Sequence, residues 1–249
     1  MNQEKHWNRI APHYEDEIFD VFRSDKLKKL PKYFKKHANK NGLAIDFGCG
    51  VGKSFAYLSP LFHKVLATDI SAECIAVAKR KDYPNIVYKR ADLTHNRLQF
   101  PKADFAFCCN VAMLPGIQRN VAIFKNIHKA LKSNGTAVIV LPSLESILYA
   151  AWRLLQWYEK EGVNPVNVPN SELHYFKGTK RDIIQGQVFI NGVLTKHYTQ
   201  EEIHVLLKEV GLTVTALEKI EYDWSTEFST PPAWMQDPYP WDWLVECRK

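Results

Sequence analysis

The sequence predicts an α/β fold, in which a doubly wound, mainly parallel sheet carries helices on both faces. Short apolar runs typical of buried strands alternate with segments whose apolar residues recur every three or four positions, as in helices. A strand, a glycine-rich turn and a helix follow one another between Leu43 and Leu61. That succession is typical of a ligand site at the carboxyl edge of such a sheet. The regular alternation also implies right-handed crossovers between the parallel strands.

The chain begins with a stretch that we expect to be helical in part. Apolar and aromatic residues lie along one side of it, namely Trp7, Ile10, Tyr14, Ile18, Val21 and Phe22. A lysine-rich segment, residues 23–40, follows, and Leu27, Leu30, Phe34 and Ala38 recur within it at helical spacing. We interpret this segment as an amphipathic helix with lysines on its solvent face, interrupted near Pro31. The alternative is that the lysines attract RNA or another anionic surface.

The glycine-rich turn is the most informative stretch of the chain. The apolar run Leu43 to Ile45 predicts a buried strand, and Asp46 stands at its end. The glycines that follow allow a sharp turn and let a ligand approach the backbone without Cβ atoms in the way; they are Gly48, Gly50 and Gly52. The residues from Lys53 to Leu61 then predict a helix.

Spacing separates three kinds of ligand site that use such a turn. A dinucleotide fingerprint needs a glycine where this chain has Lys53. A phosphate-binding P-loop needs its first glycine where this chain has Phe47, although Gly52-Lys53-Ser54 supplies the second half of that motif. The remaining pattern is an acid followed by three alternate glycines. A tight turn without any ligand is the alternative.

This pattern resembles the first motif of the class I S-adenosylmethionine-dependent methyltransferases. An acid beside the glycines suits their donor, which carries an ammonium and a sulfonium, and would repel a phosphate. The resemblance implies that S-adenosylmethionine is the cofactor and S-adenosylhomocysteine its product. It also implies donor contacts from the whole turn, that is from Asp46, Phe47, Gly48, Cys49, Gly50 and Gly52.

Two further acids follow the next two predicted strands. The strand Lys64 to Ala67 leads to Asp69, where a carboxylate can accept hydrogen bonds from both ribose hydroxyls. Ser71 caps the next helix. The strand Asn85 to Tyr88 leads to Asp92, which by resemblance accepts from the adenine amino group. The neighbours Ile70 and Leu93 complete these predicted donor contacts.

The fourth strand and the amino-terminal segment supply the last predicted donor contacts. Ala103 to Cys109 predicts a strand closed by Asn110-Val111, where the family's fourth motif meets donor and substrate. The phrase from Trp7 to Tyr14 resembles the entry segment of the small-molecule branch, which includes quinone-type methyltransferases. By that resemblance Tyr14 lies near the methionine end of the donor; the alternative is that it packs its helix on the core.

A helix from Ile117 to Leu131 and a fifth strand from Thr136 to Leu141 precede an insertion of unusual length, residues 143–198. We expect a helix from Ser143 to Lys160, and a hairpin formed by Gln187 to Ile190 and Val193 to Lys196 around Asn191-Gly192. The insertion would lie over the carboxyl edge of the sheet. Its candidate substrate contacts are Trp152, His174, Tyr175 and Arg181, although each could instead pack the insertion onto the body.

The carboxyl-terminal part predicts one helix and two strands. Thr199 and Glu202 fit a capping box for the helix Gln200 to Val210, which Gly211 ends. Leu212 to Tyr222 and Trp241 to Cys247 predict the last strands, and the resemblance implies the seven-stranded order 3-2-1-4-5-7-6. Between them lies an aromatic and proline-rich segment, residues 224–241. Its rings could cage a cationic substrate, or pack as a stiff flap against the insertion, which we favour.

Length and composition predict one domain of 249 residues. We divide it into a helical cap (1–40), a donor-binding core (41–142), an inserted lid and substrate region (143–198) and a carboxyl-terminal region (199–249). The five cysteines show no metal or disulfide spacing, so we expect no metal and a reducing compartment. A polar start and the lack of a long apolar run predict a cytoplasmic protein without membrane insertion.

We therefore expect a methyltransferase that transfers a methyl group to an N, O or C atom of a small molecule. A base is needed only if the acceptor arrives protonated, and His13, His95, His174 and His197 are not distinguished as bases by the sequence. A donor-binding regulator without turnover, an RNA methyltransferase and a P-loop NTPase are the alternatives. The acceptor, the catalytic residue and the oligomeric state do not follow from the sequence.

Overall fold

A computed structural model describes residues 3–190 and 192–249 of the chain. Its centre is a seven-stranded sheet in the order β3-β2-β1-β4-β5-β9-β8. The first five strands of this order are parallel, whereas β9 runs antiparallel to both β5 and β8. The predicted order is confirmed, since the last two strands in sequence take the places expected of them. The sheet strands are β1 (Asn39–Phe47), β2 (Phe62–Asp69), β3 (Ile86–Arg90), β4 (Ala103–Cys109), β5 (Leu131–Pro142), β8 (Thr213–Glu221) and β9 (Trp241–Arg248).

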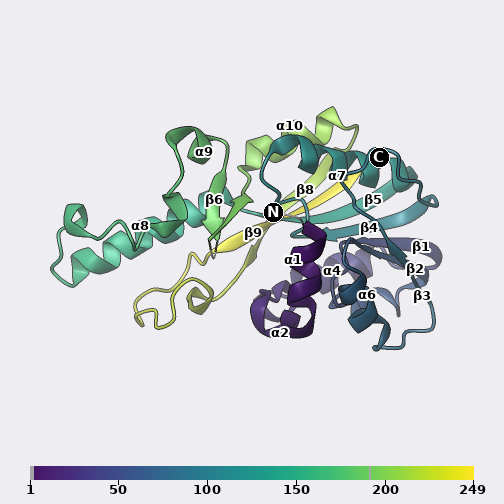
Figure 1. The fold of residues 1–249 in the computed structure, drawn as a ribbon, viewed down its shortest axis with the longest axis horizontal. Helices are drawn as coiled ribbons and strands as arrows, with labels where there is room; N and C mark the ends of the chain where they lie inside the picture. The colour runs from purple at the N-terminus through teal and green to yellow at the C-terminus, as the bar shows by residue number, and fades with distance from the viewer. Residues whose placement is uncertain (1–2, 191) are drawn as a thin grey trace.

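Helices cover both faces of the sheet, as Figure 1 shows. One apolar cluster joins a face of the sheet to α7 and α10 through Ile123, Ile127 and Leu207. A second cluster joins the other face to α4, α5 and α6, through side chains that include Phe34 and Phe55. The helices of the described residues are α1 (Gln3–Ile10), α2 (Tyr14–Glu17), α3 (Val21–Ser24), α4 (Lys29–Lys36), α5 (Phe55–Leu58), α6 (Ala72–Lys79), α7 (Ile117–Ala130), α8 (Leu144–Lys160), α9 (Lys180–Ile184) and α10 (Gln200–Glu209), with short 3-10 turns at Ala11–His13, Pro165–Asn167, His174–Phe176 and Trp224–Thr226.

The insertion after β5 has the predicted parts. Ser143 caps α8 by accepting a hydrogen bond from the amide of Ser146. Strands β6 (Gln187–Ile190) and β7 (Val193–Lys196) pair antiparallel in a sheet of their own. Part of the predicted turn, Asn191, lies outside the described residues. Figure 1 shows that α8 projects beyond the edge of the sheet, with the hairpin beside its base.

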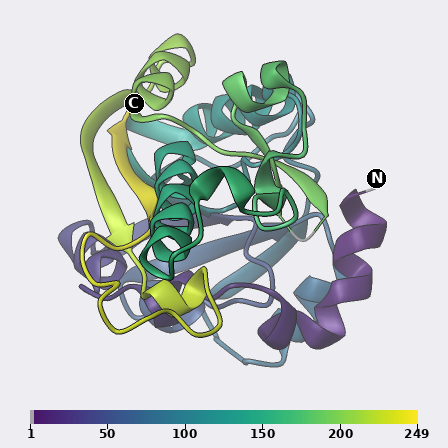
Figure 2. The ribbon, with the colours of Figure 1, turned by 90° about the vertical axis from the view of Figure 1, so that its left-hand side faces the viewer.

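The aromatic and proline-rich segment packs against the insertion, as expected. Trp224 and Met235 form a buried cluster with Ala150 of α8. The Trp224 ring stacks on Phe228, with ring centroids 5.8 Å apart. Figure 2 shows this segment running beside α8. The segment is therefore a structural flap that closes one side of the insertion.

Three details of the predicted helices are wrong. The helix expected from Lys53 to Leu61 shortens to α5, because the turn continues through Ser54. Pro31 lies in the first turn of α4, where its missing N–H is harmless, and does not interrupt the helix. Leu27 precedes that helix and is exposed instead of facing the core.

The capping box predicted for α10 forms only in part. Thr199 accepts a hydrogen bond from the amide of Glu202, as a cap should. The Glu202 carboxylate does not return to the Thr199 amide and instead pairs with the buried ammonium of Lys196 at 2.6 Å. A buried ammonium without a counter-charge costs more free energy than a helix end without a second cap.

Several cations of the amino-terminal part are paired with acids in or just after the last two strands of the chain. Lys29 pairs with Glu218 at 2.9 Å, and Lys36 pairs with Glu246 at 2.6 Å. Lys26 forms an ion pair with Asp223. These contacts fasten the lysine-rich segment to the sheet, which supports the amphipathic-helix interpretation. Among the described residues, no helix is both long and apolar enough to span a membrane.

Glu246 provides a test of this fastening. Burial alone would raise the pKa of its carboxyl, but hydrogen bonds from Lys36, His37 and Thr215 outweigh that effect and lower the pKa to about 2. Glu246→Gln is therefore expected to destabilise the fold by about 2 kcal/mol. The stability that the charge contributes is fully present above pH 4.5, the usual pKa, and is lost as the pH falls through about 2.

Urea unfolding of wild type and Glu246→Gln across that pH range checks the expectation. The exposed Glu209→Gln, which removes the same charge at the end of α10, serves as control and is expected to shift stability by less than about 0.5 kcal/mol. A difference between wild type and Glu246→Gln that stays constant from pH 6 to pH 2 would contradict this account.

Candidate functional site

The glycine turn lies at the carboxyl end of β1 and has the geometry that only glycine adopts without strain. The φ angles of Gly48, Gly50 and Gly52 are 75°, 51° and 79°. The amide of Gly48 donates to the carbonyl of Thr68 at 2.8 Å, which ties the turn to β2. A Cβ atom on Gly48 would lie 2.2 Å from Cγ2 of Val111. The turn is thus enclosed on one side by Val111, the second residue after β4.

The amino-terminal segment covers the other side of the turn. A Cβ atom on Gly50 would lie 2.6 Å from the hydroxyl of Tyr14. Burial, followed by the nearby charge of Asp69, raises the pKa of that hydroxyl well above its usual range. The segment is anchored to the helix after β2, where the Ser71 hydroxyl donates to the side chain of Asn8 at 2.7 Å. Tyr14 therefore lies at the predicted donor site.

Lys53 does not point a free ammonium at the turn. It forms ion pairs with Glu15 at 3.4 Å and Asp20 at 3.2 Å, both in the amino-terminal segment. It also lies over the ring of Tyr14, 5.5 Å from the centroid. A P-loop lysine must reach a phosphate, so these three contacts speak against the NTPase alternative.

Two predicted acids lie together beneath the turn. Asp46 is buried and accepts a hydrogen bond from the hydroxyl of Ser54. Burial raises the pKa of Asp46 to about 7, and the charge of Asp69 adds to this effect. The Asp69 carboxylate accepts from the amide of Gly50 with one oxygen and from that of Ser71 with the other, each at 2.8 Å. Each oxygen keeps acceptor capacity for a hydroxyl, and a cation would relieve the repulsion between the two acids.

Asp92 lies beyond β3, beside the end of β2. The amide of Ala91 donates to the carbonyl of Asp69 at 2.8 Å, so the two strand ends are adjacent. Asp92 accepts hydrogen bonds from the amide and the hydroxyl of Thr94, and lies 3.5 Å from the exposed ring of His95. Its neighbour Leu93 is buried. The predicted adenine contact is thus placed at the same edge as Asp69.

The remaining predicted donor residues fall around the turn in different ways. Phe47 is fully buried and packs edge-to-face on Phe100, whereas Ile70 is half-buried at the end of β2. The amide of Cys49 donates to Thr68, and the Cys49 side chain is buried. Phe47 and Cys49 therefore use their side chains for packing, and the backbone of Cys49 is hydrogen-bonded to Thr68 and Gly52.

An acid that the sequence did not single out lies next to Asn110. Asp242, the second residue of β9, pairs with Pro142 at the end of β5. Its carboxylate accepts hydrogen bonds from the side-chain amide of Asn110 at 3.0 Å and from the Tyr222 hydroxyl at 2.9 Å. Burial raises the pKa of Asp242 to about 6, although these two hydrogen bonds oppose the effect. The sequence offered one signal: a carboxylate between Trp241 and Trp243 at the start of a buried strand.

The four predicted substrate residues separate into two groups. His174 and Tyr175 line a cleft of about 360 Å³ between α8 and the aromatic flap. Trp152 is half-exposed on α8 and stacks on Tyr149 outside this cleft. Arg181 is exposed on α9, in a separate shallow recess. Only the first group shares a cavity.

The histidines also differ. His197 is buried, and burial lowers its pKa to about 4, so it stays neutral near pH 7. His13 and His95 are exposed. Within residues 3–190 and 192–249, no group of three or more histidine, cysteine or acidic side chains is arranged to hold a metal ion.

The residues of this edge fit S-adenosylmethionine. The positive φ angles of Gly48 and Gly50 shape the turn, Tyr14 and Val111 cover it, and spare acceptor capacity lies at Asp69. The acids beneath the turn suit a cationic nucleoside and oppose a phosphate. The contacts of the individual donor residues with the ligand remain a prediction.

Comparison with known proteins agrees with this arrangement. Residues 45–139 match the sequence pattern of a methyltransferase domain. That stretch begins in β1, contains the glycine turn and the three predicted acids, and ends in β5. No curated protein sequence matches the chain significantly.

Many solved structures share the fold. A complex of DhpI with SAM and HEP superposes with a TM-score of 0.65 at 18% identity, over 99% of this chain and 96% of that one. An S-adenosylmethionine-dependent methyltransferase from Mesorhizobium loti gives 0.64 at 17% identity, over 92% and 100%. The N-methyltransferase NodS from Bradyrhizobium japonicum WM9, solved with S-adenosylhomocysteine, gives 0.62 at 13% identity, over 100% and 99%. At these identities the likeness establishes the fold.

Proposed function

We propose, from the premise that this chain is an S-adenosylmethionine-dependent methyltransferase with the class I fold, that it methylates an N, O or C atom of a small-molecule acceptor. The observation that carries the proposal is the meeting of the glycine turn, Asp69 and Tyr14 at the edge from which the insertion rises. We further propose that Asp92 and Leu93 lie along the adenine, and that Asn110 and Val111 lie toward the acceptor.

The chemistry asks little of the protein beyond positioning. Bound S-adenosylmethionine supplies an electrophilic methyl group whose departure leaves a neutral thioether. The protein holds the acceptor in line with that methyl group and excludes water, and orientation of this kind can supply roughly 7–11 kcal/mol. Tyr14 and Val111 cover the turn and would exclude water from the donor. An acceptor that arrives protonated would also need a base, and the raised pKa of Asp242, beside Asn110, supports it as our candidate.

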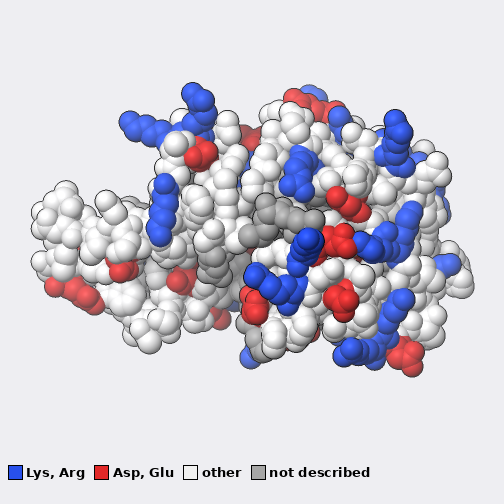
Figure 3. Space-filling view, viewed as in Figure 1, with Lys and Arg blue, Asp and Glu red and all other residues white. Residues whose placement is uncertain are grey.

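The surface favours a small molecule over a nucleic acid. Lys26, Lys29 and Lys36 of the lysine-rich segment are paired with acids of the chain itself. On the face drawn in Figure 3, basic and acidic side chains are interspersed, and no continuous basic field appears there. A cleft of about 360 Å³ also has the size of a small-molecule site. The five free cysteines support our proposal that the protein works in a reducing compartment such as the cytoplasm.

Incubation with methyl-labelled S-adenosylmethionine tests the proposal. A cell extract is divided by ultrafiltration into a small-molecule fraction and an RNA fraction, and each is offered as acceptor. We expect label in the small-molecule fraction, with S-adenosylhomocysteine released in equal amount. Label found only in RNA would replace the small-molecule acceptor by a nucleic acid, and donor binding without release of S-adenosylhomocysteine would overturn the enzymatic function.

A double variant sharpens the comparison. Lys32 and Lys35 are exposed and form no ion pair with any residue that the structure describes. Lys32→Ala/Lys35→Ala is therefore expected to leave transfer to the small molecule unchanged within twofold. An RNA methyltransferase that used this segment would lose affinity for RNA, and its salt dependence would become shallower.

A further inference from the structure

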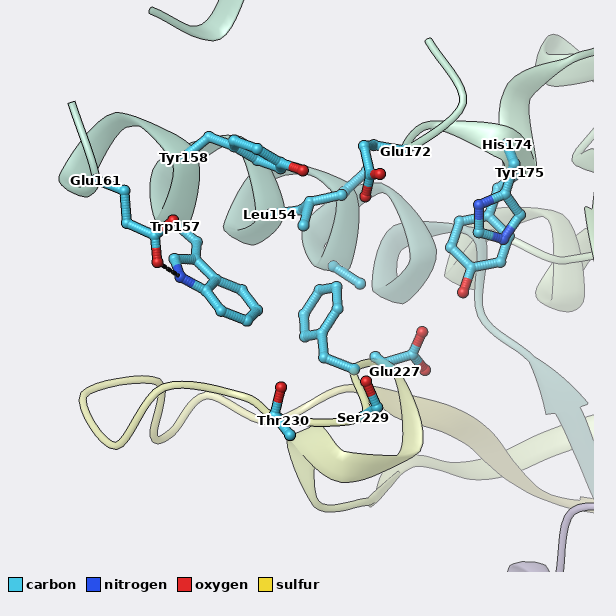
Figure 4. Close-up of a pocket in the computed structure, with 13 residues that line it drawn as sticks. Leu154, Trp157, Tyr158, Glu161, Glu172, His174, Tyr175, Glu227, Ser229 and Thr230 are labelled. Carbon is cyan, nitrogen blue, oxygen red and sulfur yellow. Dashed lines mark hydrogen bonds between the residues drawn. The ribbon is translucent and has the colours of Figure 1, made fainter. Parts of the chain in front are cut away.

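The cleft beneath α8 has walls from three parts of the chain that are far apart in sequence (Figure 4). One wall is the second half of α8, the next is the segment around the 3-10 turn His174–Phe176, and the third is the start of the aromatic flap. Its volume is about 360 Å³. The side chains that line it include Leu154, Trp157, Tyr158, Glu161, Glu172, His174, Tyr175, Glu227 and Phe228.

The charge of these walls is one-sided. Three glutamates line the cleft, and no lysine or arginine does. Glu161 accepts a hydrogen bond from the indole of Trp157, and Glu172 lies beside the hydroxyl of Tyr158. The third, Glu227, receives no hydrogen bond and no ion pair from any residue that the structure describes. Glu227 is half-buried, so its carboxylate keeps acceptor capacity toward the cleft, and a cationic ligand would supply the counter-charge that it lacks.

The cations of this region are held elsewhere. The guanidinium of Arg153 lies over the rings of Trp224 and Trp234, at 5.7 Å and 4.9 Å from their centroids. Lys160 lies over Trp234 as well, at 5.0 Å. Neither cation lines the cleft. Arg153 and Lys160 therefore lie over aromatic rings of the flap, and neither is a counter-ion for Glu227.

The electrostatics at Glu227 agree with its lack of a partner. Burial raises the pKa of its carboxyl to about 7, and the nearby charge of Asp242 adds to the effect. Burial and then the charge of Glu227 raise the pKa of Tyr175 to about 12, so this hydroxyl keeps its proton. In Figure 4 the Glu227 carboxylate points toward the side of the cleft on which Tyr175 lies. Asp242 accepts a hydrogen bond from Asn110, which follows β4. Glu227, whose carboxyl is affected by the charge of Asp242, therefore lies near the end of β4, where we place the acceptor.

We propose that this cleft binds an acceptor that carries an ammonium group, with Glu227 as the counter-ion and the aromatic walls against the apolar part of the molecule. The inference rests on the proposed function, whose substrate class it specifies. Ammonium groups also bind favourably over aromatic faces, and Trp157, Tyr175 and Phe228 provide such faces in the cleft. Such an acceptor would be held by charge at one end and by apolar contact along its length.

Binding of 2-phenylethylammonium, a compact aryl amine, tests the inference. Calorimetry at pH 8.5 in the presence of S-adenosylhomocysteine is expected to show saturable binding to wild type. The neutral 2-phenylethanol and the anionic 3-phenylpropanoate, which have similar shapes, are expected to bind at least tenfold more weakly. Equal binding of the three compounds would overturn the inference.

Glu227→Gln removes the charge and keeps the shape. It is expected to weaken 2-phenylethylammonium binding about 10- to 30-fold and to leave the affinity for S-adenosylhomocysteine unchanged within twofold. The matched control Glu209→Gln removes an exposed acid at the end of α10 and is expected to change neither affinity. If Glu227→Gln binds the amine as wild type does, Glu227 is not the counter-ion and the proposal fails.

The pH dependence gives a second readout. Below about pH 7 Glu227 takes up a proton and loses its charge, so amine affinity is expected to fall toward tenfold per unit as the pH decreases. The groups that face Glu227 from neighbouring elements are Asp242, Tyr175, His174 and Glu172. His174→Asn should retain the dependence, and Glu227→Gln should flatten it; the reverse pattern would assign it to the histidine.

The two failures can be distinguished. If wild type binds S-adenosylhomocysteine but no 2-phenylethylammonium, the ammonium inference is overturned and the proposed methyltransferase function stands. If neither S-adenosylmethionine nor S-adenosylhomocysteine binds, the proposed function itself fails, whatever the amine does. Both titrations use the whole chain, so neither depends on an isolated fragment.

Discussion

Replacing Asp69 by asparagine is expected to weaken binding of S-adenosylmethionine by about 100-fold. The carboxylate accepts from the amides of Gly50 and Ser71, and its spare acceptor capacity is what we assign to the two ribose hydroxyls. Hydrogen bonds to a charged group contribute about 1.5–3 kcal/mol each, and 1.4 kcal/mol corresponds to a factor of ten in affinity. Calorimetric titration of the variant with S-adenosylmethionine measures the effect.

A matched control variant shows whether the loss of any acidic charge would weaken binding of the donor. Asp82 stands in the turn after α6 with a φ of 51°, a conformation that asparagine also adopts. Asp82→Asn is therefore expected to bind the donor as wild type does. If folded Asp69→Asn binds S-adenosylmethionine with unchanged affinity, Asp69 does not contact the ribose hydroxyls.

Gly48→Ala is expected to destabilise the protein by about 2–5 kcal/mol. The added methyl group would be strained at a φ of 75° and would lie 2.2 Å from Cγ2 of Val111. The left-handed conformation costs about 1–2 kcal/mol for alanine, and overpacking adds about 1–3 kcal/mol. For a chain of this size the melting temperature should fall by roughly 4–20 °C. Thermal unfolding followed by circular dichroism measures the shift.

Two further variants separate the sources of that cost. Gly162→Ala has the same kind of strain, at a φ of 84°, but its added methyl group would meet nothing within 4 Å. It is expected to cost about 1–2 kcal/mol. Gly48→Ala/Val111→Ala removes both Cγ atoms and should recover part of the loss relative to the sum of the single variants. Strict additivity would mean that Val111 does not cover the turn.

The elements of the fold were predictable where the signal was local. The strand Ala103–Cys109 and the paired hairpin strands have the bounds that their patterns predicted, and Ser71 caps α6 as expected. The α5 helix was too long in the prediction, because apolar spacing after Gly52 did not reveal that the turn continues. The position of Leu27 could not be read from helical spacing either, since the helix that would bury it begins only at Lys29.

The sequence could predict which acids share the carboxyl edge of the sheet, but of the cleft it predicted His174 and Tyr175 and not Glu227. Asp46 and Asp69 lie at the ends of β1 and β2, and Asp92 follows β3, so their common edge is a consequence of parallel topology. Asp242 reaches Asn110, and Glu227 reaches the cleft, only through contacts between distant parts of the chain; the hydrogen bond from Asn110 to Asp242 joins residues 132 positions apart. No local pattern specifies such a contact, because it depends on how the insertion and the flap pack together.

The most direct measurement is a crystal structure of the protein soaked with S-adenosylhomocysteine. The account predicts density over the glycine turn, with both ribose hydroxyls within hydrogen-bond distance of Asp69 and the homocysteine end beneath Tyr14. Density in any other place, such as the cleft beneath α8, or Asp69 turned away from the bound nucleoside, would contradict it.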